Sequence, residues 1–401
     1  LAVAAGATVV AALVIGLSAA GVSLVRARRA EALARREAET SSQVAKFLTE
    51  LFRVSDPGEA RGNSVTAREI LDRGAERIRV ELAAQPLVQA QLMRTMGSVY
   101  RAMGLFAQAQ PLLEQAIALE QPRLAPDDPA LQASILELGR LAQQQGRSAV
   151  AESLFRKTLG VRERTLGAND PALMVTLSAL GGVLVQRGQF AAAESLLTRA
   201  VALRAKNPAP EDADFARTLR TLASAHLVQG RYAEAEPVFR RALDILERVA
   251  GADHPDVGRT LSNLGVIYYG LKRYDEAEQY YVRAEANLSK SLGENHPNIA
   301  SININMGEIA WHRGQLPAAQ ARLLRALAIF AKQVVPTFAS IGTAEYDLAN
   351  VLRDMGKYAE AETRYRKAIR IRETSYGLEN PQVAEVLVEY AKLLRLTQRP
   401  Q

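Results

Sequence analysis

The residues best suited to hold another molecule are two arginines and two asparagines that recur at one interval. Arg217 and Arg259 lie 42 residues apart, as do Asn263 and Asn305, and Arg259 precedes Asn263 by one helical turn. An asparagine amide donates and accepts hydrogen bonds at once, which suits the backbone of an extended chain. Arginine binds carboxylates through paired hydrogen bonds. These residues predict a polar patch on neighbouring helices, and its two arginines favour an acidic segment or a carboxylate; the alternative is solvated surface.

No set of residues predicts catalysis, a cofactor or a metal centre on this chain. The four histidines are His226, His254, His296 and His312, and no pair has the HExxH spacing of a zinc site. His254 and His296 stand 42 residues apart, each before a proline, which is typical of a helix start. Cysteine is absent, which excludes disulfides, thiolate nucleophiles and cysteine-ligated metals. We expect no cofactor, no metal and no enzymatic activity from this chain itself.

Composition favours helix over sheet and sets only weak limits on partners. Hydrophobic residues make up 48% of the 401 residues, which is enough for a core, whereas aromatic residues make up 5%. Ala, Leu, Arg and Glu dominate, and these residues are strong helix formers. The formal net charge of +7 is mild for this length. It permits an acidic partner or an anionic lipid surface without requiring either, and no nucleic-acid partner is expected.

Small residues recur along the chain at a constant interval of 42. We call a set of residues spaced by 42 a phase of the repeat. The first phase, which we call the glycine phase, consists of Gly104, Gly146, Gly188, Gly230, Lys272, Gly314 and Gly356. Five residues later every step holds alanine: Ala109, Ala151, Ala193, Ala235, Ala277, Ala319 and Ala361. Seven residues before the first phase stand Gly97, Gly139, Gly181, Ala223, Gly265, Gly307 and Ala349. A fixed period with small residues at fixed phases predicts a repeat solenoid.

Each phase has a physical reason. The glycine phase lies between two helical patterns, where the chain reverses and a left-handed backbone is easiest for glycine. The alanine and Gly/Ala phases mark close crossings between paired helices. Linkers such as "DDP" (127–129), "DHP" (253–255) and "NHP" (295–297) are helix starts. Residues 85–397 therefore predict about seven helix pairs and a final unpaired helix, which either caps the array or begins a further repeat.

The N-terminal segment predicts membrane insertion. Residues 1–25 carry no charge and are long enough for a transmembrane helix. A signal peptide is the alternative, but the basic start that it needs is missing. Ala12, Gly16 and Ala20 share one helical face, either as a contact between membrane helices or as part of an Ala-rich helix without a partner.

Residues 26–84 predict a helical neck and an N-terminal cap for the repeats. Five arginines between 26 and 37 favour the cytoplasmic side for the rest of the chain, although interleaved glutamates also fit a solvated helix. An apolar stripe runs through Val44, Phe47, Leu48, Leu51 and Phe52. Thr66 and Glu69 fit a capping box for a further helix that ends near Ala84.

The repeats resemble the tetratricopeptide repeat in its 42-residue form typical of kinesin light chain. The match covers roughly residues 87–397 and is clearest in "DHPDVGRTLSNLGVIYYGLKRYDEAEQYYVRAE" (253–285). Lys272 departs from the turn glycine, and "EDAD" (211–214) and "TFAS" (337–340) lack the linker proline. The resemblance implies an all-α superhelical solenoid of antiparallel helix pairs, whose first helices line a concave groove. In that family an asparagine at the phase of Asn263 and Asn305 holds the backbone of a bound peptide. Trp311 is expected in the core or the groove lining.

The order of segments also looks like the C-terminal half of bacterial membrane-bound serine/threonine kinases. In such proteins the kinase domain precedes the membrane helix, and its HRD, DFG and Gly-rich motifs are absent here. The chain begins with Leu1, so we expect sequence upstream of it. The repeats of that family lie outside the cytoplasm, in the periplasm, whereas the arginine flank favours the cytoplasm, so the membrane side stays open.

The sequence leaves three hypotheses of function. The first is a single-pass, membrane-anchored scaffold that binds a protein or peptide in the groove of its repeats. The alternative is the sensor or docking region of a receptor-type serine/threonine kinase. A third is an oligomer joined through the neck stripe at residues 47–52.

Overall fold

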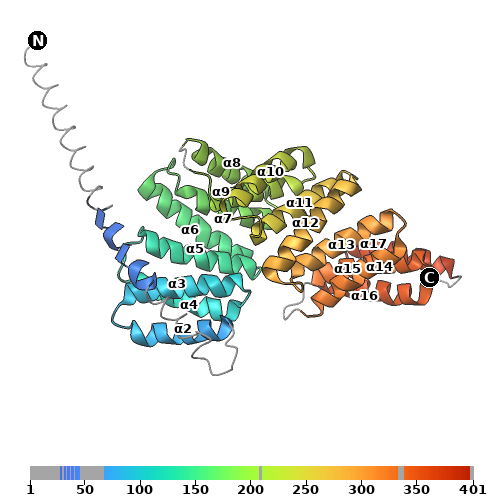
Figure 1. The fold of residues 1–401 in the computed structure, drawn as a ribbon, viewed down its shortest axis with the longest axis horizontal. Helices are drawn as coiled ribbons and strands as arrows, with labels where there is room; N and C mark the ends of the chain where they lie inside the picture. Colours follow the sequence, from blue (N-terminus) through green and yellow to red (C-terminus); the bar gives the residue numbers. More distant parts are fainter. Residues whose placement is uncertain are drawn as a thin grey trace, which may run out of the picture. The chain divides into compact units, whose positions relative to one another are not determined.

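The chain folds into a succession of helices. The computed structural model describes residues 67–206, 210–332 and 338–397, together with short stretches between 28 and 45. Helices α2 to α17 follow one another along this described part, which contains no strand (Figure 1). They belong to two compact units, Leu1–Ala168 and Asn169–Gln401. The predicted all-α repeat fold is confirmed for the described residues.

From residue 67 on, the described part of the first unit holds two helix pairs and the helix before them. Its helices are α2 (Ala67–Glu81), α3 (Pro86–Ala102), α4 (Phe106–Glu120), α5 (Pro129–Gln144) and α6 (Ser148–Leu166). α2 packs on α3, and its Ile78 is fully buried in the core. Arg36, from the N-terminal part, donates hydrogen bonds of 2.9 and 2.7 Å to the two carboxylate oxygens of Asp128 at the start of α5. α2 is the helix that the capping box predicts, and it covers one side of α3.

The second unit holds five helix pairs and one further helix. Its helices are α7 (Leu173–Gln186), α8 (Phe190–Lys206), α9 (Ala213–Leu227), α10 (Tyr232–Val249), α11 (Pro255–Gly270), α12 (Tyr274–Leu292), α13 (Pro297–His312), α14 (Leu316–Phe330), α15 (Phe338–Asp354), α16 (Tyr358–Tyr376) and α17 (Pro381–Leu396). Each helix contacts only the next two helices along the chain and the two before it, and the contact within each pair is the most extensive. Stability is therefore built from neighbouring interfaces.

The turn within each pair takes the left-handed backbone that the glycine phase predicts. The six glycines have φ between 71° and 78°, and Lys272 takes φ 59° at the same place. The Lys272 N–H donates to the Tyr269 carbonyl at 2.9 Å, and the Arg273 N–H donates to the Tyr268 carbonyl at 2.8 Å. The turn at Gly314 makes the matching pair of bonds. Lys272 therefore keeps the geometry of the turn without being a glycine.

The small residues lie where paired helices touch. All seven alanines that follow the turns by five residues are 0% exposed. A Cβ added at Gly139 would stand 2.4 Å from the Phe155 ring, and one at Gly265 would stand 2.5 Å from the Tyr281 ring. Only a small residue on the first helix leaves room for the large side chain of the second.

The linkers cap the first helices. At each of the five linkers that end with Asp, Asn or His before a proline, the side chain accepts a hydrogen bond from the backbone N–H two residues later: Asp128, Asp170, His254, His296 and Asn380. His254 and His296 accept through Nδ1 at 3.2 Å. The predicted helix-start role of these two histidines is confirmed.

The predicted membrane localisation is not supported. Of the helices that the structure describes, none is both long enough and apolar enough to cross a membrane. This finding contradicts the predicted single-pass membrane localisation. The segment 1–25 itself, the neck stripe at 47–52 and the cap at Thr66 lie outside the described residues.

Candidate functional site

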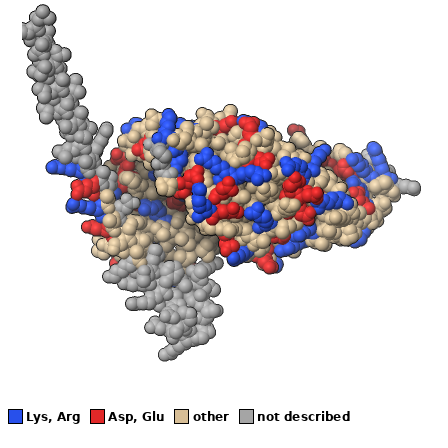
Figure 2. Space-filling view, turned by 45° about the horizontal axis from the view of Figure 1, so that its top comes forward, with Lys and Arg blue, Asp and Glu red and all other residues tan. Residues whose placement is uncertain are grey.

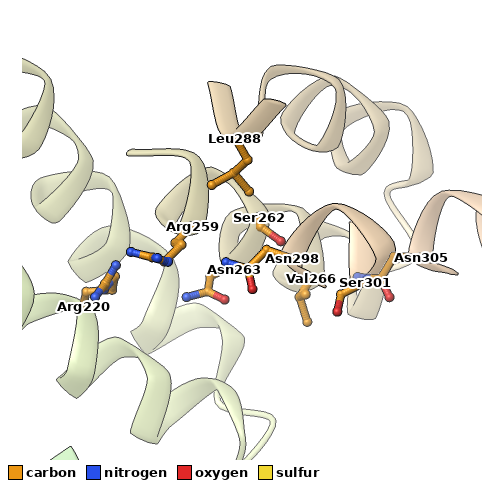
Figure 3. Close-up of a pocket in the computed structure, with 9 residues that line it drawn as sticks. All are labelled: Arg220, Arg259, Ser262, Asn263, Val266, Leu288, Asn298, Ser301 and Asn305. Carbon is orange, nitrogen blue, oxygen red and sulfur yellow. The ribbon is translucent and has the colours of Figure 1, made fainter. Parts of the chain in front are cut away.

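A pocket opens among the first helices of three successive pairs. Its volume is about 420 Å³. It is lined by Arg220 of α9, by Arg259, Ser262, Asn263 and Val266 of α11, by Leu288 of α12, and by Asn298, Ser301 and Asn305 of α13. Figure 3 shows the two arginines at one end and Asn305 at the other. The pocket is therefore a polar cleft that crosses neighbouring repeats.

One carboxylate holds both arginines in place. Asp256, at the start of α11, is 7% exposed, and its Oδ1 accepts hydrogen bonds from Arg220 at 2.7 Å and Arg259 at 2.8 Å. Burial alone would raise the pKa of Asp256, but the charge and hydrogen bonds of the two arginines outweigh it and hold that pKa well below its usual range. Two guanidinium groups thus share one negative charge, which leaves this end of the pocket with an excess of positive charge.

The start of α13 forms the opposite wall. The His296 ring caps the helix by accepting from the backbone N–H of Asn298, whose side chain lines the pocket. Burial and the nearby Arg259 lower the pKa of His296, which keeps its Nδ1 free to accept. The same histidine therefore fixes the backbone of the wall without adding charge.

The two predicted asparagines differ in their surroundings. The Asn305 amide donates to the Tyr281 hydroxyl at 3.1 Å, which fixes its orientation and leaves its oxygen as an acceptor. Asn263 makes no side-chain hydrogen bond within the described part of the chain, so both its donor and its acceptor are available. Ser262 and Ser301 add hydroxyl groups between them.

In the next repeat, an aspartate stands at the position that Asn263 and Asn305 hold in their repeats. Asp347 of α15 is 4% exposed, and its Oδ2 has no hydrogen-bond partner among the described residues. Burial and the charge of Glu308 on α13 raise the pKa of Asp347 well above its usual range, and burial also raises the pKa of Glu308. The amide pair is therefore confined to α11 and α13.

The structure brings together three of the four predicted site residues. Arg259, Asn263 and Asn305 line the pocket, whereas Arg217 stands outside it and pairs with Asp214 on its own helix. Arg220 takes the expected place of Arg217. A spacing in the sequence could have identified Arg220 as a site residue. Arg220 precedes its partner Asp256 by 36 residues, and the same spacing recurs in the ion pairs Arg101–Glu137 and Arg353–Glu389.

Trp311 has another role. Its side chain is half-buried at the end of α13, stacks on His312 and donates from Nε1 to Asp354 at 2.8 Å. It therefore joins α13 to α15 and does not line this pocket.

Charged groups are interleaved elsewhere on the surface. Figure 2 shows lysine and arginine side chains mixed with aspartate and glutamate over the visible face. No group of three or more His, Asp or Glu side chains suited to a metal ion occurs among the described residues. Two arginines also share one carboxylate at Glu285 and at Glu211, so the amides beside its arginine pair set the pocket apart.

The chain belongs to the tetratricopeptide repeat family. One family model of that description matches residues 131–206, 214–290, 267–332 and 340–401, and a second matches 94–160 and 178–246. Comparison with curated proteins gives no match.

Solved structures share the fold at low sequence identity. The Rap protein complexed with Competence and Sporulation Factor is 13% identical with a TM-score of 0.54, over 89% of this chain and 99% of that one. Aspartyl phosphate phosphatase F from Bacillus subtilis is 14% identical with a TM-score of 0.52, over 85% and 83% of the two chains. BtubC from P. vanneervenii is 24% identical with a TM-score of 0.47, over 60% and 94%. The likenesses to the Rap protein and to the phosphatase show the fold and leave the function to be argued from the site.

Proposed function

We propose that this chain is a protein-binding scaffold whose pocket between α9, α11 and α13 holds an extended peptide segment bearing a carboxylate. The observation that carries the proposal is the pair of guanidinium groups that share the single carboxylate of Asp256. The repeat family supports a binding role, because stacked helix pairs present an extended surface for partners.

The arginine end favours an acidic ligand for an electrostatic reason. Arg259 is 39% exposed, whereas Arg220 is 18% exposed, so Arg259 offers its unused N–H groups to a ligand and Arg220 anchors the pair. A guanidinium fixed by a neighbour loses little side-chain freedom when it binds a carboxylate. The positively charged guanidinium group of Arg259 is thus already oriented before the ligand binds.

The amide end favours an extended backbone. Asn263 offers a free donor and a free acceptor, and Asn305 offers an oriented oxygen. Together these groups match the alternating N–H and C=O groups of a peptide strand. The Rap protein of the same fold is itself complexed with Competence and Sporulation Factor, which supports a binding role for this array.

Peptide arrays test the charge preference. Acidic segments are displayed beside copies in which Asp and Glu become Asn and Gln, and binders are measured by calorimetry with the full chain. We expect the acidic copies to bind more tightly. Arg259→Ala should weaken them by about 10- to 100-fold, because a hydrogen bond to a charged group contributes about 1.5–3 kcal/mol.

Arg217→Ala is the matched control. Arg217 stands at the phase of Arg259 one repeat earlier, is 41% exposed and lies outside the pocket. Its removal should leave affinity nearly unchanged. Equal binding of acidic and amide copies would overturn the charge preference. Unchanged binding by the variant with alanine at Arg259, Asn263 and Asn305 would overturn the site.

The kinase hypothesis gains no observation of its own. No described residue and no similar protein favours a sensor role over a scaffold. Sequencing upstream of Leu1 would decide it, because a lysine-bearing strand with HRD and DFG motifs defines a kinase.

A further inference from the structure

Four aromatic rings meet where the helices α11 and α13 end. Tyr269 of α11 packs against Tyr274 of α12 with ring centroids 5.8 Å apart, and Tyr274 stacks on His312 of α13 at 5.5 Å. Trp311 also stacks on His312, at 5.5 Å. His312 is exposed, and the other three residues are half-buried. These four rings, which we call the aromatic cluster, are therefore accessible from solvent.

Two carboxyl groups lie beside the aromatic cluster. Glu308, one helical turn before His312 on α13, is hydrogen-bonded to the Tyr269 hydroxyl and to Asp347 of α15. The same hydroxyl lies 3.3 Å from Nε2 of His312. Glu308 is half-buried, whereas Asp347 is 4% exposed. Glu308 and Asp347, which we call the carboxyl pair, therefore form one continuous site with the rings, and a ligand reaches the pair through Glu308.

The carboxyl pair lacks a basic partner. Within the described part of the chain, neither Glu308 nor Asp347 forms an ion pair with a lysine or arginine, and Oδ2 of Asp347 has no hydrogen-bond partner. Burial raises the pKa of both groups, and the charge of Glu308 raises that of Asp347 further. Two adjacent carboxyl groups repel each other when both are ionised, so a cation beside them would relieve the repulsion. The pair is thus suited to a ligand with a positive charge.

The other charged groups around the carboxyl pair are matched among themselves. Arg372 of α16 and Glu385 of α17 both act on the charge of Asp347, and they pair with each other at 2.9 Å. Asp354, which accepts a hydrogen bond from the indole of the aromatic cluster, pairs with Arg353 at 2.9 Å. These groups therefore neither supply the missing cation nor add free negative charge.

We infer that this site binds the side chain of an arginine, with its guanidinium against the aromatic cluster and hydrogen-bonded to Glu308. A guanidinium is planar, so it stacks on aromatic rings, and the N–H groups at its edge suit carboxylate oxygens. A hard metal ion fits less well, because it takes about six or more oxygen ligands and the site offers two carboxyl groups. The arginine belongs to a partner protein, because arrays of this family present extended surfaces to partners.

The arginine site continues a row of positions that begins in the peptide pocket. Glu308 stands at the phase of Val266 and Asp347 at that of Asn263, and both counterparts line the pocket. Asn305, also in the pocket, is one helical turn from Glu308. A partner segment that fills both places carries an acidic residue and a basic one. This last step rests on the proposed function, whereas the arginine site rests on its own residues.

The single tryptophan of the chain reports on the site. Trp311 belongs to the aromatic cluster, so its fluorescence in the full chain should follow binding there. The probe is N-acetyl-arginine amide, and N-acetyl-citrulline amide, in which a neutral urea group replaces the guanidinium, is the matched control. At constant ionic strength we expect the arginine compound to change the fluorescence and to saturate with a dissociation constant of about 1 mM. The citrulline compound should give no saturable change. An equal response to both compounds, or no saturation by the arginine compound, would overturn the inference.

Three variants locate the binding. Glu308→Gln removes the charge at nearly constant size and should weaken the arginine compound by about tenfold or more, because a hydrogen bond to a charged group is lost. Glu294→Gln is the matched control, because Glu294 is exposed in the linker before α13, and it should leave the affinity unchanged. Unchanged affinity in Glu308→Gln would overturn the site.

Arg259→Ala separates this site from the peptide pocket. It removes the exposed arginine of the pocket and should leave the affinity for the arginine compound unchanged. A loss of that affinity would place the compound in the pocket and overturn the inference. Failure of the acidic peptides to bind would, by contrast, count against the pocket alone.

Discussion

Lys272 is the position where one substitution should stabilise the array. It takes φ 59° at a turn where the other six repeats have glycine. A left-handed backbone costs an L-residue about 1–2 kcal/mol. We therefore expect Lys272→Gly to relieve a strain that is confined to the turn between α11 and α12.

The magnitude is the difference between two opposing effects. Relief of the left-handed conformation gains about 1–2 kcal/mol, whereas glycine costs about 0.5–1 kcal/mol more in lost backbone freedom. The difference is a stabilisation of about 0.5–1 kcal/mol. Side-chain contacts should not disturb it, because Lys272 is exposed and a Cβ at the equivalent Gly314 would meet no atom within 4 Å.

Hydrogen exchange is the suitable assay, because a repeat array opens locally and a global melting temperature averages over many interfaces. Amides in α11 and α12 should exchange about two- to fivefold more slowly in Lys272→Gly. Lys272→Ala should bring no such protection, and Gly314→Ala should accelerate exchange in α13 and α14. Faster exchange in Lys272→Gly than in the wild type would refute the argument from backbone strain.

Three further predictions concern packing and pH. Ala277→Leu should destabilise the protein by about 1–3 kcal/mol in thermal unfolding, because Ala277 is 0% exposed at a helix crossing. Gly265→Ala should destabilise α11 and α12 in hydrogen exchange, since its Cβ would stand 2.5 Å from the Tyr281 ring. Lowering the pH from neutral toward about 4 should stabilise α13 and α15 against urea, because Glu308 and Asp347 have raised pKa values and the folded state then binds more protons than the unfolded one.

Each of these predictions has a control. Ala277→Gly opens space and should not overpack, so equal thermal stability of Ala277→Leu and wild type would count against the close crossing. Gly160→Ala controls for an added methyl group at a helical glycine, because its Cβ would meet only the Arg164 side chain at 3.8 Å, and no effect of Gly265→Ala would contradict the predicted contact. Glu308→Gln should flatten the pH dependence above about 4, where unfolded carboxyls are ionised; a slope that persists in this variant would exclude the carboxyl pair as its cause.

The repeat geometry was predictable from the sequence because a period records physical constraints at the level of single residues. Glycine at Gly230 or Gly314 marks a left-handed turn, and Ala277 marks a crossing too tight for a larger residue. These constraints are local to one helix pair, so position along the chain is enough to reveal them.

The composition of the pocket was only partly predictable. Arg217 and Arg220 lie on the same helix, and the sequence does not say which of them meets a carboxylate on the next helix. Packing decides this, because Arg220 reaches Asp256 across the repeat boundary whereas Arg217 reaches only Asp214. Pairings between repeats depend on how helices are rotated about their axes, and a period of small residues does not fix that rotation at the level of single side chains.

In the second unit, no helix contacts one more than two places away along the chain, and this has a mechanical consequence. Short loops between contacting segments cost little entropy to close, so a ribosome can release each pair to fold while later ones are still being made. Tension applied to the two ends of this unit would unfold its helix pairs one after another. A force transmitted through a bound partner would therefore extend the array in steps.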